Sequence, residues 1–116
     1  MAHFARIENN IVQQTIVVAN EDCGGGDYPA SEPIGQAFIA SLNLEGTWLQ
    51  TSYNHNFRNQ YAGWLDLYIP DQDVFVSPQP YPSWTLNNNH RWQAPTPMPE
   101  EDGFWIWNET EQVWER

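Results

Sequence analysis

The chain has 116 residues, the length of one domain or of two small ones. Fifteen acidic residues against four basic ones give a formal net charge of −11. Nucleic-acid binding depends on lysine and arginine to neutralise phosphates, so this balance argues against a nucleic-acid partner, and an anionic membrane surface would repel the chain.

The single cysteine, Cys23, excludes an internal disulfide framework. No apolar run is long enough to cross a bilayer, and the first residues lack the layout of a signal peptide. We therefore expect synthesis and folding in a cytoplasm.

The first eighteen residues predict a β-hairpin. Two β-prone runs, HFARIE and IVQQTIVV, are separated by Asn9 and Asn10, which readily adopt the positive φ of a tight turn. The Gly- and Pro-rich residues 20–33 then predict a loop. Its three consecutive glycines lack the Lys and Ser/Thr of a phosphate-binding loop.

A short helix is predicted over residues 33–42, with Ser31 as its N-cap and Pro33 in its first turn. Because Gly35 weakens it, this helix requires packing against a sheet. Its expected apolar stripe, at a spacing of four residues, consists of Ile34, Phe38 and Leu42.

Residues 46–54 predict a strand with two usable faces. Trp48, Gln50 and Ser52 fall on one face, and the other carries Thr47, Leu49, Thr51 and Tyr53. The polar residues that follow predict an ordered loop. We therefore expect residues 1–62 to form a small α+β unit of hairpin, helix and strand.

Residues 63–116 differ in character, with no helix candidate and seven of the nine prolines. Three segments share one plan, a pair of apolar or aromatic positions six or seven residues apart around an Asn/Asp-rich or polar turn: Tyr68 and Phe75, Leu86 and Trp92, Trp107 and Trp114. Each predicts a β-hairpin. The connectors SPQPYPS and APTPMPEEDG favour extended polyproline II geometry. The predicted fold is therefore α+β and β-dominated, ending in successive aromatic-rich hairpins joined by proline-rich spacers.

Four segments carry a resemblance to a known family: MAHFARIENNIVQQTIVV, GTWLQTSYNHNFRNQYAG, PQPYPSWTLNNNHRWQAPTPMPEEDG and WIWNETEQVW. Together they resemble a family of small acidic proteins encoded by tailed bacteriophages of marine bacteria, including cyanophages. The resemblance implies a phage-encoded component of the virion, assembled in the host cytoplasm. It supplies no catalytic motif.

The residues themselves offer no catalytic constellation either. The three histidines, His3, His55 and His90, are scattered through different elements, and no zinc-hydrolase, CxxC or GxSxG motif is present. Acidic pairs such as Asp71 and Asp73 lie in predicted turns, without the twelve-residue pattern of a calcium loop. We expect no enzyme, no metal and no cofactor.

The tryptophans of the second half allow two interpretations. They either fill a small core or form a platform on which sugar rings stack. On strand parity, Trp105 and Trp107 share one face of a hairpin, while Phe104 and Ile106 share the other. Apolar side chains on both faces mean that both are covered, by the protein itself or by a partner. The candidate partner- or glycan-binding residues are Tyr81, Trp84, Trp92, Met98, Trp105, Trp107 and Trp114.

The function predicted from the sequence is a non-enzymatic structural or accessory protein of a phage virion that decorates or cements the capsid. The alternative is a tail or tail-fibre accessory protein that binds host surface glycans through exposed tryptophans. The expected partners are capsid or tail subunits, and self-association is left open.

Overall fold

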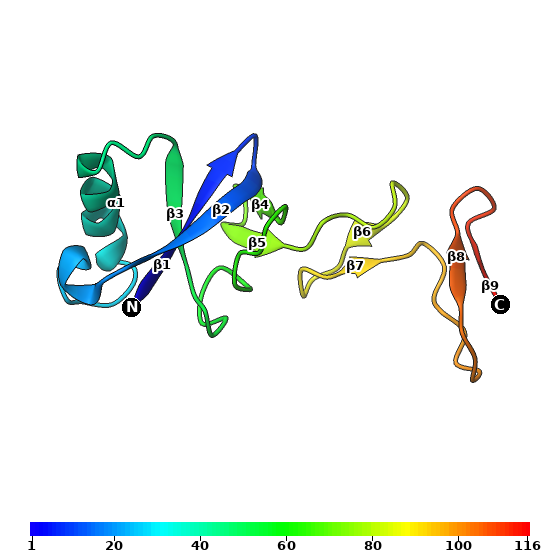
Figure 1. Cartoon of the computed structure of the whole chain (residues 1–116). Coiled ribbons are helices and arrows are strands. Elements are labelled where there is room, and N and C mark those ends of the chain that lie inside the picture. Colours follow the sequence, from blue (N-terminus) through cyan, green and yellow to red (C-terminus); the bar gives the residue numbers. More distant parts are fainter. The chain divides into compact units, whose positions relative to one another are not determined.

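A computed structural model describes all residues from 1 to 116. The protein is an α+β, β-dominated fold with one α-helix, a curled five-stranded antiparallel sheet and two small two-stranded sheets (Figure 1). It divides into two compact units, Met1–Ser77 and Pro78–Arg116, which are described separately. No helix has the length and apolar character needed to cross a membrane.

The sheet of the first unit has the strand order β3-β1-β2-β4-β5. Its first two strands, β1 (Ala2–Glu8) and β2 (Ile11–Val18), form the predicted hairpin. Asn9 and Asn10 have φ values of 53° and 63°. Two consecutive positive φ angles give the turn whose twist matches that of the flanking strands, and asparagine tolerates them better than most residues.

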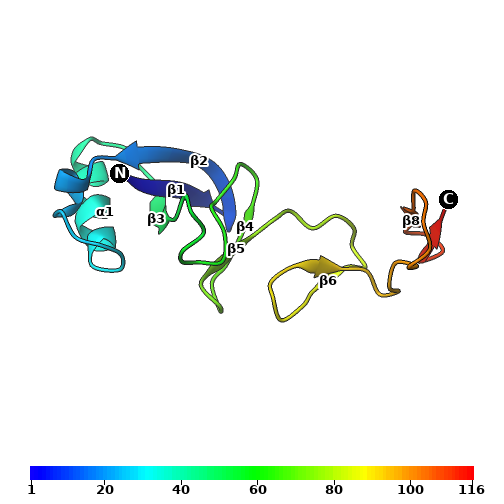
Figure 2. The same ribbon diagram turned by 90° about the horizontal axis from the view of Figure 1, so that it is seen from below.

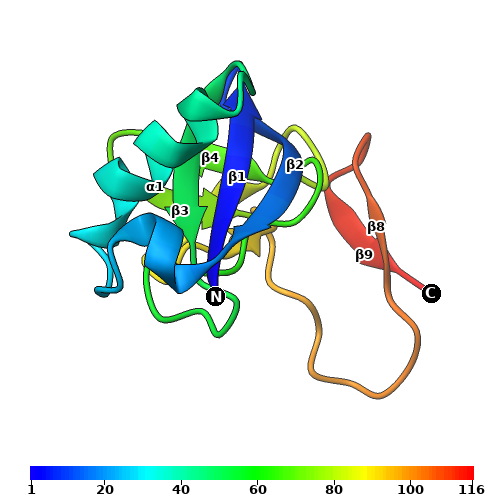
Figure 3. The ribbon, with the colours of Figure 1, turned by 60° about the vertical axis from the view of Figure 1, so that its left-hand side comes forward.

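Strand β1 is buried on both faces of the sheet. Phe4 and Ala5 are both fully buried, although neighbouring side chains in a strand point in opposite directions. Phe4 belongs to a cluster formed with helix α1 (Ser31–Ser41) and the 3-10 turn Asn20–Cys23, while Ala5 belongs to a second cluster with Ala62 and Phe75. Figure 3 shows α1 beside β1 and β3 (Thr47–Thr51).

The apolar stripe predicted for the helix is wrong. Two of its three members, Ile34 and Leu42, are 47% and 52% exposed. The buried residues are instead Ser31, Gly35 and Ile39. The helix therefore packs on the side of its glycine, one residue away from the predicted face.

Gly35 determines this orientation because it allows the ring of Phe4 to approach the helix backbone. A Cβ atom at position 35 would lie 2.3 Å from Phe4 Cζ and 3.0 Å from Cys23 Sγ. Any larger residue would force the Phe4 ring or the helix to shift. The glycine that weakens the isolated helix is therefore the position at which the helix makes its closest tertiary contact.

The predicted capping role of Ser31 is also wrong. Ser31 is the first helical residue, Ala30 occupies the N-cap, and no side chain caps the helix. The buried Ser31 hydroxyl donates a hydrogen bond of 2.7 Å to Gln50 Oε1 on β3. The Ser31 hydroxyl therefore satisfies the buried Gln50 side chain on β3 and does not cap the helix.

Strand β3 pairs with β1 and uses both of its faces, as predicted. Trp48 is buried in the cluster beneath α1, whereas Leu49 packs against the opposite cluster. The strand is shorter than the predicted range of 46–54.

The hairpin formed by β4 (Leu67–Ile69) and β5 (Val74–Val76) belongs to the same sheet, because Ile11 of β2 pairs with Leu67. All three β5 residues are buried, with Phe75 fully enclosed. The division between the units therefore falls after Ser77, whereas the change in composition along the sequence predicts it after Ala62.

One buried arginine ties these elements together. Only 7% of the Arg58 side chain is exposed, and it bonds to both carboxylate oxygens of Glu32 on α1, to the Gln50 carbonyl on β3 and to Asp73 in the β4–β5 turn. Burial opposes the guanidinium charge, but the bonds with Glu32 and Asp73 outweigh it and raise the pKa of Arg58. The Tyr28 ring lies 5.3 Å from the guanidinium.

The second unit contains two short hairpins, visible in Figures 1 and 2. One consists of β6 (Thr85–Leu86) and β7 (Trp92–Gln93), and the other of β8 (Ile106–Asn108) and β9 (Val113–Glu115). Leu86 pairs with Trp92, and Trp107 pairs with Trp114. Such short strands provide little ladder bonding, so contacts between side chains must hold this unit together.

Candidate interaction surface

Three tryptophans form the centre of the second unit. Trp84, Trp107 and Trp114 meet edge to face, with ring centroids 5.2 to 6.0 Å apart. Tyr81 lies against Trp84 at 5.7 Å. Such edge-to-face pairs contribute roughly 0.5–1.5 kcal/mol each beyond the area that they bury. This tryptophan cluster fastens the residues before β6 to the β8–β9 hairpin.

A carboxylate anchors the same contact. Glu109, in the β8–β9 turn, accepts hydrogen bonds from the Ser83 hydroxyl at 2.6 Å, the Ser83 backbone N–H at 3.1 Å and Trp107 Nε1 at 2.8 Å. The bonds from Ser83 and Trp107 lower the pKa of Glu109. The Trp114 indole donates to the Thr96 carbonyl at 2.8 Å, which fixes the proline-rich connector to β9.

Trp105 lies outside the tryptophan cluster. Its indole N–H donates to the Glu101 carbonyl at 3.0 Å, and the Arg116 guanidinium lies 4.6 Å from its ring centre. Arg116 also forms a 2.8 Å ion pair with the Glu101 carboxylate. Cation–π contact and ion pair together occupy one side of the Trp105 ring.

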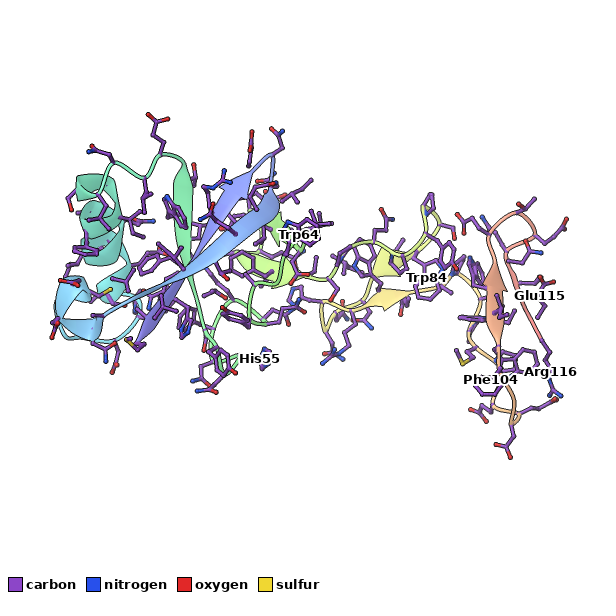
Figure 4. All side chains as sticks on the ribbon, viewed as in Figure 1. His55, Trp64, Trp84, Phe104, Glu115 and Arg116 are labelled. Atoms are coloured by element: carbon purple, nitrogen blue, oxygen red, sulfur yellow. The ribbon has the colours of Figure 1, made fainter.

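The other face of the β8–β9 hairpin is uncovered. Phe104 is 93% exposed, Ile106 is 62% exposed and Val113 is 43% exposed. The register of β8 with β9 puts Ile106 and Val113 on one side of the hairpin, with the polar pair Asn108 and Glu115, and Phe104 lies two residues before β8. Figure 4 shows Phe104 projecting near Arg116 at one end of the hairpin. We call Phe104, Ile106 and Val113 the open apolar face.

The predicted binding residues therefore occupy different environments. Tyr81, Trp84, Trp107 and Trp114 are brought together, and Trp107 is only 5% exposed. Trp92 is partly buried on β7, Met98 is 53% exposed in the connector, and Trp105 packs with Arg116. The prediction that these residues contact a partner stays a prediction.

The open apolar face is missing from the predicted set, although the alternation of strand residues had placed Phe104 and Ile106 on a face of their own. The open apolar face differs from the side that carries Trp107 and Trp114 in being exposed to solvent. Sequence parity tells which residues share a side of a strand, but it does not tell which side the rest of the chain covers.

The structure contains no group of three or more His, Cys, Asp or Glu side chains arranged to hold a metal ion. Comparison of the chain with protein-family models, with curated proteins and with solved structures finds no match.

Proposed function

We propose that the protein is a non-enzymatic structural or accessory component of a phage virion and that it decorates or cements the capsid. The resemblance of its sequence segments to small acidic proteins of marine tailed phages supports the virion assignment. The net charge of −11 fits attachment to a particle through apolar contacts, since it opposes nonspecific association with other anionic surfaces.

The open apolar face is the observation that carries the contact with the particle. An exposed phenylalanine beside an exposed isoleucine leaves apolar area in water that a partner would bury, at about 25 cal/mol per Å². Aromatic side chains of this kind provide most of the affinity at many interfaces.

The aromatic-rich hairpins and proline spacers form part of the same proposal. Extended proline-rich segments need little further ordering when they bind, which lowers the entropic cost of docking. Tyr81 and Met98 lie in these spacers and serve as secondary anchors beside Phe104.

A reconstitution experiment tests the proposal. Purified protein is added to particles that lack it, and bound protein is quantified after sedimentation. We expect saturable, stoichiometric binding that falls at least about tenfold in affinity for the double variant Phe104→Ser/Ile106→Ser, a loss of about 1.4 kcal/mol. Trp64→Ser is the matched control, because Trp64 is 73% exposed in the first unit.

Absence of the protein from purified particles would refute the virion role. If the double variant binds particles as tightly as the wild type, the open apolar face is not the contact. Tyr81→Ala and Trp84→Ala then test whether the tryptophan cluster is. Quantitative mass spectrometry of copy number separates the locations. Hundreds of copies per particle indicate the capsid, and a few indicate the tail.

The second candidate, a tail accessory that binds glycans, is favoured by the partial exposure of Trp105. Its ring is an available stacking surface on the side away from Arg116. A glycan array with Trp105→Ala tests it directly. Trp107→Ala is less informative, because Trp107 is buried and its removal would disturb the tryptophan cluster.

A further inference from the structure

The first unit contains a cavity of about 740 Å³ that neither the tryptophan cluster nor the open apolar face touches. Its walls come from the start of β1, residues 26–28 and the chain from the end of β3 through Phe57. Small-molecule sites fall in this size range. All of its lining residues belong to the first unit.

Aromatic rings form two sides of the cavity. Tyr28 and Phe57 stack with centroids 3.8 Å apart and an angle of 6° between the rings. Tyr53 stacks on His3 at 5.5 Å, yet remains 65% exposed. Tyr53 also meets the Tyr61 ring at 5.4 Å, so it is a large ring held by two contacts and otherwise open to solvent.

Carboxamide side chains complete the lining. Asn20, Asn54 and Asn56 all line the cavity, and their side-chain amides make no hydrogen bond within the chain. Each carboxamide offers both donors and acceptors, which is the combination that pairs with hydroxyl groups.

The loop that carries two of these amides is held in shape before any ligand arrives. The His55 backbone N–H donates to the Ser52 carbonyl at 3.0 Å, and the Asn56 N–H donates to the Ser52 hydroxyl at 2.9 Å. His55, labelled in Figure 4, has a φ of 61°, and its Nδ1 accepts a 2.9 Å bond from the Tyr61 N–H. A loop fixed in this way pays less entropy on binding.

The charges select the class of ligand. No lysine or arginine side chain lines the cavity, whose formal charges are the Asp27 carboxylate and the α-ammonium of Met1. A phosphorylated or carboxylated ligand would meet as many negative as positive groups there, in a strongly negative chain and with no guanidinium to bind it in a bidentate way. Rings that can cover an apolar surface, combined with amides that can bond hydroxyls, fit a neutral polyhydroxylated ring.

We propose that this cavity is a binding site for a neutral saccharide, in which Tyr53 stacks on a sugar ring and Asn54 and Asn56 bond to its hydroxyls. The site shares no residue with the tryptophan cluster or with Trp105, and the proposal does not depend on the virion role proposed above. On a particle it would give the protein a receptor-binding face separate from its attachment face.

The test uses the full-length ¹⁵N-labelled protein. Maltohexaose, cellohexaose, laminarihexaose, chitohexaose and mannohexaose are titrated while amide shifts are recorded by NMR, and an array of neutral bacterial polysaccharides is screened in parallel. We expect at least one of these glycans to shift the amides of Tyr53 and Asn54 in a saturable way. Tyr53→Ala and the double variant Asn54→Ala/Asn56→Ala should each weaken binding at least about tenfold.

Trp64→Ala is the matched control, because it removes an exposed aromatic of the same unit outside the cavity. Unshifted β5 resonances in each variant show that the unit is folded, since no β5 residue lines the cavity. No binding to any glycan of the panel or the array overturns the proposal. So does binding that persists in both Tyr53→Ala and the asparagine double variant, or binding that Trp105→Ala abolishes. Tyr53→Ala should bind particles as the wild type does. The saccharide proposal and the virion proposal can therefore fail independently of each other.

Discussion

Replacing Arg58 tests whether a single side chain holds the first unit together. Arg58 joins helix α1, strand β3 and the β4–β5 turn through its bonds to Glu32, Gln50 and Asp73. In Arg58→Met the volume is largely preserved while every one of these bonds is lost. Glu32, only 17% exposed, then keeps a hydrogen bond from the Gln50 backbone N–H but has no cationic partner.

The expected cost follows from the burial of each arm. Removing one member of a buried ion pair costs about 3–5 kcal/mol, mainly because the remaining charge is stranded. The Asp73 arm is half exposed and adds no more than about 1 kcal/mol. A unit of this length has a stability of roughly 4–12 kcal/mol. Because Glu32 keeps the Gln50 N–H bond and is partly exposed, we expect Arg58→Met to lose an amount at the lower end of this range, about 3–4 kcal/mol, which is a large part of the total.

Urea titration followed by ¹H–¹⁵N NMR measures this loss for each unit separately. Cross-peaks of β1 report the first unit, and those of β8 and β9 report the second. With an m-value of about 1.5 kcal/mol per M, the β1 midpoint should fall by about 2 M. The β8–β9 midpoint should not move.

Two further variants keep the experiment interpretable. The double variant Arg58→Met/Glu32→Gln removes the stranded charge and should recover part of the loss, even if Arg58→Met does not fold. Arg6→Met is the matched control, since the polar contacts of Arg6 are exposed ones, with Glu8 at 3.7 Å and with Gln14 Oε1 at 3.2 Å. A midpoint change for Arg58→Met no larger than that for Arg6→Met would refute the reasoning.

Three other predictions concern packing and titration. Gly35→Ala should lower the free energy of unfolding by about 1–3 kcal/mol despite the helix preference of alanine, because the new Cβ overlaps Phe4. Gly26→Ala is the control, because the space around Gly26 is open, and it should change the free energy of unfolding by less than about 0.5 kcal/mol. The same urea titration measures both. Trp107→Ala should cost about 3–5 kcal/mol and broaden NMR signals of the second unit only, and preserved β8–β9 signals would contradict this. Hydrogen bonds hold the pKa of Glu109 below its ordinary value of 4.5. The stabilisation that Glu109 provides is therefore complete above pH 4.5 and is lost as the pH falls through the lower pKa of the folded state. Near-ultraviolet circular dichroism should show a transition below about pH 4.5, and this transition should be smaller in Glu109→Gln.

Local patterns predicted the elements of the first unit but not how they pack. The Asn9-Asn10 turn and the strand alternation around Trp48 are determined by neighbours in the sequence, so the hairpin and strand could be predicted. The buried face of the helix could not, because it depends on Phe4 meeting Gly35 across the sheet. A search for apolar stripes ignores glycine, yet the missing side chain of Gly35 is what lets Phe4 pack against the helix.

The candidate sites were predictable to different degrees. Strand parity identified Phe104 and Ile106 as a separate face, and the structure adds that this face is open. The cavity lined by Tyr28 and Tyr53 could not be predicted, because only the fold brings these two residues together. The contacts of Arg58 likewise join segments up to 26 residues apart.

The order of burial along the chain has a consequence during synthesis. The last strand of the five-stranded sheet is complete at Val76, so the first unit has all of its core as soon as that residue has left the ribosome. The indole cluster, by contrast, cannot close until Trp114 has been added. Until then the second unit has no closed core, and the prolines between its indoles keep that segment extended rather than collapsed.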